Sequence, residues 1–413
     1  MSADRPQDRP QDRPQDRPQD RPQDRMEDPV VVAMRCCLLG DTAGADDALA
    51  RVVSAGRTDE LLERAAEQRV LGALEPHVRG VPHLDPAIAD RLARQAIGHA
   101  AHQLRILEGL RWFGALMDAE GIAWLTFKGP VVAQLLYRPV VLRTFQDLDL
   151  LVPRSDFPRA IGALEREGGA LLDRNWRLIG REGRAQLHVA LPLETEADIH
   201  WHVLNRHSIR STFTLDIATA LERARTVDLE GLSVPTFDRV DTLVHLALHA
   251  ALGGGDRLSW FEDIRRSIQI EAPPWEDVVA RARGWGAGAS VAVTLRRARD
   301  ALGAEVPTWV LRALDPSTSH RVVGEWIERR RPVTRPHTER DPVSLWARLI
   351  RDRPGPLVRT VAHRLAQPVS GALHRMAGEP GADKGSPSGA VFQPAGTRME
   401  QRRYMDAVLS GDA

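Results

Sequence analysis

One short stretch constrains the fold of this chain more than any other, because carboxylate and aliphatic side chains alternate along it. Its sequence is DLDLLV, from Asp147 to Val152. A period of two predicts a β-strand, with Asp147 and Asp149 on one face of a sheet and Leu148 and Leu150 in a core on the other. Two carboxylates on one strand face repel each other unless a positive charge lies between them. We therefore expect this strand to hold a divalent cation, Mg²⁺ (or Mn²⁺).

A second strand carries a third carboxylate. The sequence ADIHWHV, residues 197–203, places Asp198, His200 and His202 on one strand face. If the two strands are neighbours, three carboxylates converge and can hold two metal ions about 3.5–4 Å apart, the arrangement for in-line nucleotidyl transfer. The two histidines then line this pocket or, alternatively, hold zinc.

A third segment with candidate functional residues is Phe127-Lys128-Gly129-Pro130, at the junction between an expected strand and an expected helix. A helix N-terminus with an unhindered backbone favours an anion. Lys128 is one of only two lysines among 56 basic residues, so arginine has replaced lysine almost everywhere else. We expect Lys128 and Gly129 to bind phosphate, with Arg143 as a second phosphate clamp.

Both ends of the chain have the composition of disordered segments. Five copies of Arg-Pro-Gln-Asp, without one apolar side chain, occupy residues 5–24. We expect disorder over residues 1–26, and Met26 is an alternative start of translation. The Gly-, Pro- and Ser-rich residues 366–413 predict a disordered tail.

The remaining chain divides into three regions. Helical spacing of apolar residues predicts an N-terminal helical region over 27–96 and a C-terminal helical region over 238–365, and one long amphipathic helix over 86–119. Between them, residues 97–237 alternate strands and helices. This predicts an α/β (α+β) core with a mixed sheet and flanking helices, including a weak strand at 171–178.

Charge and composition narrow the class of protein. The 56 basic and 56 acidic residues cancel, which gives no strong nucleic-acid signal. We find no uninterrupted run of 18 apolar residues and no apolar signal-peptide core, so we expect no membrane span. The two cysteines, Cys36 and Cys37, are adjacent and cannot build a disulfide framework. We expect a cytoplasmic protein.

The combined motifs resemble a known family. The string FKGPVVAQLLYRPVVLRTFQDLDLLVP, followed by DIHWHV, is similar to the uncharacterised nucleotidyltransferase family of the DNA polymerase β-like superfamily. Shared features are Lys-Gly, a helix ending in Tyr, Arg before Asp-x-Asp-Leu-Leu-Val, and a later Asp-x-His-Trp. The resemblance covers about residues 60–270, including His249 and the Trp260–Asp263 segment.

The resemblance implies a nucleotidyltransferase fold with flanking helices. It implies that Asp147 and Asp149 are metal ligands, that Asp198 is the third carboxylate, and that Lys128 and Gly129 stand where the wider superfamily carries Gly-Ser. In this chain proline follows Gly129, and proline has no N–H to donate.

Two further residues are weaker candidates. His249 lies four residues after His245 on one helix face, which suits either metal ligands or packing against the catalytic unit. Asp263 either orients the helices or approaches the acceptor pocket, and the resemblance alone singles it out.

Three hypotheses remain open. The first is a metal-dependent nucleotidyltransferase that moves a nucleoside monophosphate from an NTP, with ATP as the first candidate, to a small molecule, peptide or protein. The second is a catalytically silent nucleotide-sensing or antitoxin-like partner-binding module on the same fold. The third is a helical scaffold with a chance Asp-x-Asp, in which Asp198 does not face Asp147 and Asp149. The sequence does not define the acceptor or the oligomeric state.

Overall fold

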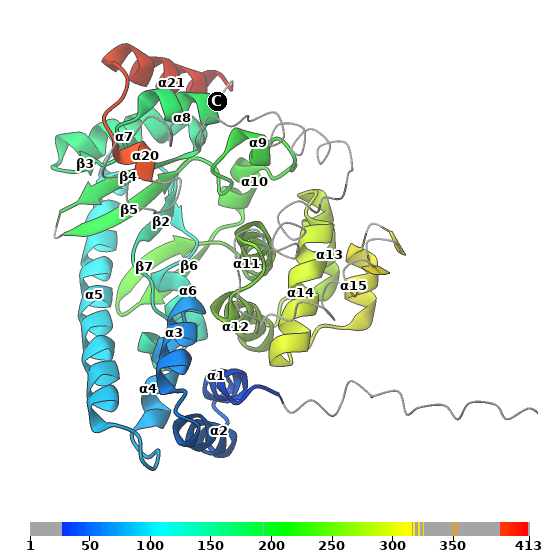
Figure 1. Cartoon of the computed structure of the whole chain (residues 1–413). Coiled ribbons are helices and arrows are strands. Elements are labelled where there is room, and N and C mark those ends of the chain that lie inside the picture. The colour runs from blue at the N-terminus through cyan, green and yellow to red at the C-terminus, as the bar shows by residue number, and fades with distance from the viewer. Residues whose placement is uncertain are drawn as a thin grey trace, which may run out of the picture.

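The computed structural model describes residues 27–192, 194–315 and 389–411, together with the isolated positions 317, 318, 321, 322, 325, 350 and 352. The disorder expected for residues 1–26 and 366–388 lies outside the described residues. The described chain is a mixed α/β structure, in which a five-stranded sheet is flanked by helices (Figure 1). The predicted fold class is confirmed.

The sheet has the strand order β1-β2-β5-β4-β3. Its strands are β1 (Leu125–Thr126), β2 (Leu148–Leu151), β3 (Ala170–Leu171), β4 (Gln186–Leu191) and β5 (Thr195–His200). The central pair β2–β5 is parallel and the other pairs are antiparallel, so the sheet is mixed as expected. Both strands that carry the acidic motifs are therefore central neighbours.

Alternation gives the sheet an apolar face and a polar face. In β4, Leu187, Val189 and Leu191 are buried, whereas Gln186 and His188 between them are half-buried on the opposite face. The apolar face packs against helices α5 (Pro86–Ala119) and α7 (Phe157–Arg166). The polar face is thereby left to form a site.

Helix α5 connects the two halves of the molecule. The proline at its first position and the Asp85 carboxylate, which accepts the Ala87 N–H, start it at the expected residue. Its 34 residues extend over roughly 50 Å. Leu92 packs among the N-terminal helices, and Phe113 packs under the sheet. Figure 1 shows α5 running along one side of the molecule.

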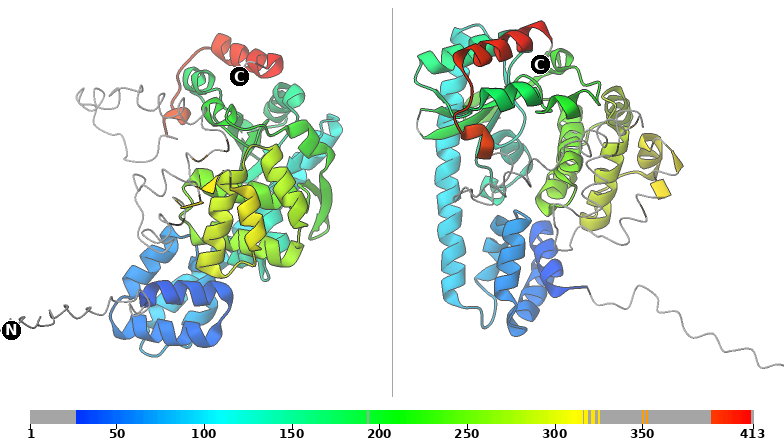
Figure 2. Two further views of the ribbon diagram at one scale, coloured as in Figure 1. Left: turned by 90° about the vertical axis from the view of Figure 1, so that its right-hand side faces the viewer. Right: turned by 45° about the horizontal axis from the view of Figure 1, so that its top comes forward.

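The N-terminal and C-terminal helices share one hydrophobic core. The former are α1 (Pro29–Leu39), α2 (Thr42–Ser54), α3 (Thr58–Glu67) and α4 (Leu71–Val78); the latter are α11 (Arg239–Gly253), α12 (Leu258–Arg266), the π-helical turn η4 (Ser267–Glu271), α13 (Trp275–Gly284), α14 (Gly288–Leu302) and α15 (Thr308–Leu314). Figure 2 shows the two groups from two further directions. Segments far apart in the sequence thus form one helical body next to the sheet.

Short elements connect these parts. They are α6 (Pro130–Leu136), η2 (Val140–Leu142), η3 (Arg154–Asp156), α8 (Trp176–Glu182), α9 (His207–Arg210), α10 (Ile217–Glu222) and the hairpin β6 (Arg225–Leu229) and β7 (Leu232–Thr236). Among the described residues, no helix is both long enough and apolar enough to cross a membrane.

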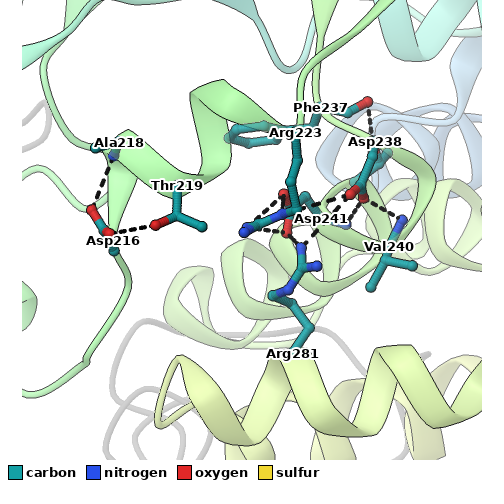
Figure 3. Close-up of polar contacts among 10 residues, drawn as sticks. Asp216, Ala218, Thr219, Arg223, Phe237, Asp238, Val240, Asp241 and Arg281 are labelled. Carbon is teal, nitrogen blue, oxygen red and sulfur yellow. Dashed lines mark hydrogen bonds and ion pairs between the residues drawn. The ribbon is translucent and has the colours of Figure 1, made fainter.

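A buried charge cluster ties α11 to its neighbours (Figure 3). Asp238 caps α11 by accepting the N–H groups of Val240 and Asp241. The fully buried Asp241 carboxylate pairs with Arg223, which follows α10, and with Arg281 of α13. Because two guanidinium groups compensate one buried carboxylate, this cluster fixes α10, α11 and α13 relative to one another.

Two local expectations are wrong. The strand expected at 171–178 is only the two-residue β3 followed by α8, because the Asn175 side chain accepts the Leu178 N–H and starts a helix there. The prediction of a disordered tail is also wrong over residues 389–411, which form α20 (Gly389–Phe392) and α21 (Arg398–Ser410).

Helix α21 is held by both capping and burial. Thr397 and Glu400 form a reciprocal capping box at its start. Tyr404 and Val408 are buried against the sheet unit, and the Tyr404 hydroxyl donates to the Arg184 carbonyl at 2.7 Å. Composition alone missed this helix because its apolar positions are few and follow a Gly- and Pro-rich stretch.

Candidate active site

Three carboxylates converge where β2 lies beside β5. In the register of this parallel pair Asp149 lies directly opposite Asp198, and Asp147 immediately precedes β2. All three line a cavity of about 810 Å³. The expectation that Asp198 shares a face with the other two carboxylates agrees with this geometry.

Asp149 is the most strongly paired of the three. The Lys128 ammonium lies 3.1 Å from its Oδ1 atom, and His200 donates to the same oxygen from Nε2 at 3.2 Å. Burial opposes ionisation of Asp149, but Lys128 and His200 together hold the pKa of this carboxyl well below its usual range. Asp149 is therefore an ionised acceptor at neutral pH.

Asp147 has the opposite electrostatics. Burial, followed by the negative charges of Asp149 and Asp198, raises the pKa of Asp147 from 3.8 to about 6. Within the described part of the chain, its side chain makes no hydrogen bond. The site thus contains more negative charge than its own basic residues compensate.

Asp198 is oriented by β4, its antiparallel neighbour. Gln186 donates to Asp198 Oδ2 at 2.7 Å, and His188 donates from Nδ1 to Asp198 Oδ1 at 2.8 Å. The other ring nitrogen of His188 donates to Glu196 Oε2 at 3.0 Å. Although burial opposes the charge, Asp198 and Glu196 raise the pKa of His188 to about 9, so the imidazole is an imidazolium at neutral pH.

The donor set fits a divalent cation. One ligand atom from each of Asp149, Asp198 and His200 lies within 4.8 Å of the others, and Asp147 adds a carboxylate at the same cavity wall. Burial, and after it the negative charges of Asp149 and Asp198, disfavour the charge of Asp147, and a cation would offset both effects. Carboxylate oxygens with open positions for water and phosphate are the environment that Mg²⁺ and Mn²⁺ prefer.

The Lys-Gly turn lies against the carboxylates. Gly129 precedes α6 with a φ of 54°, a conformation that residues with a Cβ rarely adopt. A Cβ at this position would lie 3.1 Å from the backbone oxygen of Asp147. Glycine therefore allows the turn to approach the strand that carries Asp147, which keeps Lys128 close to Asp149.

Arg143 is used differently from the expected phosphate clamp. Its Nε and Nη2 atoms donate to the two oxygens of Asp263 at 2.8 and 2.9 Å, and Nη1 donates to the Gly129 carbonyl at 3.0 Å. The Tyr137 hydroxyl also donates to Asp263 Oδ1, at 2.6 Å. Asp263 of α12 thus holds Arg143, and Arg143 holds the Gly129 turn.

The candidate histidines separate into three environments. His249 lines the cavity, His200 lies behind Asp149, and His202 is not among the cavity-lining residues. Burial and then Lys128 lower the pKa of His249 to about 3, and burial and then Arg210 lower that of His202 to about 3. His245 is buried against Phe127, so it packs rather than lining the site.

Part of the cavity wall is helical. It is formed by residues of the α3–α4 connection, α5, α11 and α12, namely Ala66, Arg69, Leu71, His99, His102, Leu246, His249, Trp260 and Asp263. His102 donates to the Gln146 carbonyl at 3.0 Å, next to Asp147. Both helical regions predicted from the sequence therefore contribute to the same cavity.

Several residues of the site were not predicted from the sequence. Gln186 and His188 lie on the polar face of β4, and the short β4–β5 connection sets a register in which His188 faces Asp198. Pairing these two strands as a hairpin would have found them. Arg69 carries no local signal, because its position depends on how the neighbouring Gln68 attaches the α3–α4 turn to the start of α12.

The comparisons with known proteins give one match. Neither a curated protein nor a solved structure matches the chain. A family model described as "Uncharacterised nucleotidyltransferase" matches residues 54–303, more than half of the 413 residues, and this range contains all three carboxylates and the Lys-Gly turn. The chain belongs to this family of uncharacterised nucleotidyltransferases.

Proposed function

We propose that this protein is a metal-dependent nucleotidyltransferase that binds a nucleoside triphosphate, first of all ATP, and transfers the nucleoside monophosphate to an acceptor. The observation that supports this most directly is the alignment of Asp149 and Asp198 on neighbouring parallel strands, with Asp147 lining the same cavity. The family match supports a transferase in general terms. The acceptor is a small molecule, a peptide or a protein side chain with a free hydroxyl.

Each part of the site has a role in this reaction. Asp147, Asp149 and Asp198 would hold Mg²⁺ or Mn²⁺, which supplies charge stabilisation for the phosphates and activates a hydroxyl for in-line attack, by a two-metal mechanism. The acceptor oxygen forms a bond to the α-phosphorus, the bond from that phosphorus to the bridging oxygen breaks, and pyrophosphate leaves. Asp198, held in place by Gln186 and His188, takes the proton of the acceptor hydroxyl.

In this proposal Lys128 binds phosphate. Its ammonium faces Asp149 at the cavity wall, and a triphosphate entering the cavity offers it a second anionic partner. The cavity, at about 810 Å³, lies toward the upper end of the range for small-molecule sites. This volume suits a nucleotide together with part of an acceptor.

Isothermal titration calorimetry tests the proposal. ATP, GTP, CTP and UTP are titrated into the wild type and into the Asp147→Asn/Asp149→Asn double variant, with and without Mg²⁺. We expect binding that requires Mg²⁺ and is lost in the double variant, which would justify an acceptor screen with α-labelled nucleotide. Metal-independent binding that the double variant retains would favour the silent nucleotide-sensing module. If no nucleotide binds, both the nucleotidyltransferase and the nucleotide-sensing module are contradicted.

A further inference from the structure

Because Arg143 is already bonded to Asp263 and Gly129, few cationic side chains of the cavity remain to bind the phosphate chain of a nucleotide. The lysine and arginine side chains lining the cavity within the described residues are Arg69, Lys128 and Arg143. Arg143 is taken by Asp263 and Gly129, and Lys128 already pairs with Asp149. His249 adds no charge at neutral pH, because its pKa is lowered to about 3. Arg69 therefore remains as a cation not committed to the protein.

Arg69 is exposed at the cavity wall, and in the described part of the chain its guanidinium has no ion-pair or hydrogen-bond partner. Its backbone has a φ of 54°, the left-handed region that favours glycine. Glycine adopts this conformation more easily than arginine, so a simple helix-ending turn would be better served by glycine. Unfavourable backbone conformations of this kind concentrate at functional sites.

The preceding residue fixes where Arg69 projects. Gln68 is buried, and its Oε1 atom accepts the Leu258 N–H at 2.8 Å while its carbonyl accepts the Ser259 N–H at 3.4 Å. These are N–H groups at the start of α12, which has no side-chain cap from its own N-cap residue. Gln68 thus caps α12 from another region of the chain and attaches the α3–α4 turn to the helix that carries Trp260 and Asp263.

We propose that Arg69 binds the phosphate chain of the substrate, and that the α3–α4 turn thereby completes the nucleotide site from the helical part of the cavity wall. This inference rests on the proposed function and deepens it, because it assigns the role expected of Arg143 to a residue of the N-terminal helical region. The ligand chemistry is that of a polyphosphate, recognised by a guanidinium with free N–H donors.

Tripolyphosphate, which lacks a nucleoside, is the direct probe. Its Mg²⁺-dependent binding and that of ATP are measured by calorimetry on the full chain for the wild type, Arg69→Gln, Arg69→Gly and Arg69→Lys. We expect Arg69→Gln and Arg69→Gly to weaken tripolyphosphate binding at least about tenfold and Arg69→Lys to weaken it less. Arg69→Gly suits the left-handed backbone, so loss of binding in this variant does not come from misfolding.

Arg79→Gln is the matched control. It removes the same charge from an exposed arginine at the end of α4 that does not line the cavity. We expect this variant to bind both ligands like the wild type. Equal weakening in Arg79→Gln and Arg69→Gln would overturn the inference, since it would show an effect of net charge alone.

The outcomes separate the inference from the proposed function. If Arg69→Gln and Arg69→Gly bind tripolyphosphate like the wild type while Asp149→Asn loses Mg²⁺-dependent binding, Arg69 is not a phosphate ligand and the proposed function stands. If the Arg69 variants lose binding but Asp149→Asn does not, Arg69 is confirmed and the metal-dependent function is wrong. If the wild type binds neither tripolyphosphate nor ATP, both are wrong.

Discussion

Asp149 and Asp198 lie opposite each other on neighbouring parallel strands, and each has its own basic partner, Lys128 for Asp149 and His188 for Asp198. These basic partners offset the repulsion between the two neighbouring carboxylates. Asp147 has no such basic partner among the described residues, and its pKa is raised. A cation at this site would offset the charge of Asp147, as the proposed metal binding requires.

Asp147→Asn should therefore stabilise the protein in the absence of metal. The pKa of Asp147 is about 6 in the fold against 3.8 in the unfolded chain, so folding stability falls as pH rises from 3.8 to 6 and stays reduced above that. Removing this charge should increase the free energy of unfolding by about 3 kcal/mol at pH 7.5 and leave it unchanged below pH 3.8. Thermal denaturation across this pH range measures the difference.

Asp90→Asn is the control for that experiment, because Asp90 is exposed on α5 and does not line the cavity. Its stability should follow the wild type at every pH. A lower unfolding temperature for Asp147→Asn at pH 7.5 would contradict the proposed repulsion.

Asp263→Asn should destabilise the fold strongly. The substitution removes the charge of the buried Asp263 carboxylate, which compensates the half-buried Arg143, and places an amide N–H₂ opposite a guanidinium. Breaking a buried pair in this way costs about 3–5 kcal/mol, which denaturant unfolding would show. Asp300→Asn breaks the exposed pair with Arg299, and its effect should stay within about 0.5 kcal/mol. Equal effects of both variants would show that the Asp263 pair does not organise the site.

Gly129→Ala should weaken both stability and nucleotide binding. A Cβ at this position would have a positive φ of 54° and would lie 3.1 Å from the Asp147 backbone oxygen, so the backbone is strained and the neighbouring strand must shift slightly. We expect a loss of at least about 1–2 kcal/mol in the free energy of unfolding, and weaker Mg²⁺-dependent ATP binding because Lys128 moves with the turn. Gly80→Ala adds the same methyl group in open space and should retain ATP binding. Unchanged ATP affinity in Gly129→Ala would argue against a role of this turn in the site.

Tyr404→Phe tests whether the C-terminal helix is part of the folded unit. The hydroxyl donates to the Arg184 carbonyl and accepts from Trp201 Nε1 at 3.3 Å. Removing it leaves two buried groups without a partner and should cost about 1–3 kcal/mol in thermal unfolding. Met399→Ala, at an exposed position of the same helix, should have little effect. If both variants behave like the wild type, α21 does not stabilise the sheet unit.

Local patterns in the sequence predicted the elements that local physics determines. Proline and a capping aspartate gave α5 its start, and alternation placed Asp198 and His200 on one strand face. The partner of Arg143 could not be predicted in this way. Asp263 lies 120 residues from Arg143 in the sequence, and their pairing depends on how α12 packs beside α6.

Two other predictions from the sequence were wrong, one because of a local cap and one because of a long-range contact. A single capping residue, Asn175, changed an expected strand into α8, and the buried Tyr404 found its acceptor 220 residues away. Tertiary contacts of this length overrode composition, which is why residues 389–411 are folded despite the Gly- and Pro-rich stretch before them.

Anomalous scattering from Mn²⁺, in crystals of the wild type soaked with MnCl₂ and a non-hydrolysable ATP analogue, tests the proposed metal site directly. We predict a Mn²⁺ peak coordinated by Asp149 and Asp198, with the phosphates of the analogue in contact with Lys128. Mn²⁺ or the analogue bound only outside this cavity, with the three carboxylates uncoordinated, would contradict a metal-dependent nucleotidyltransferase.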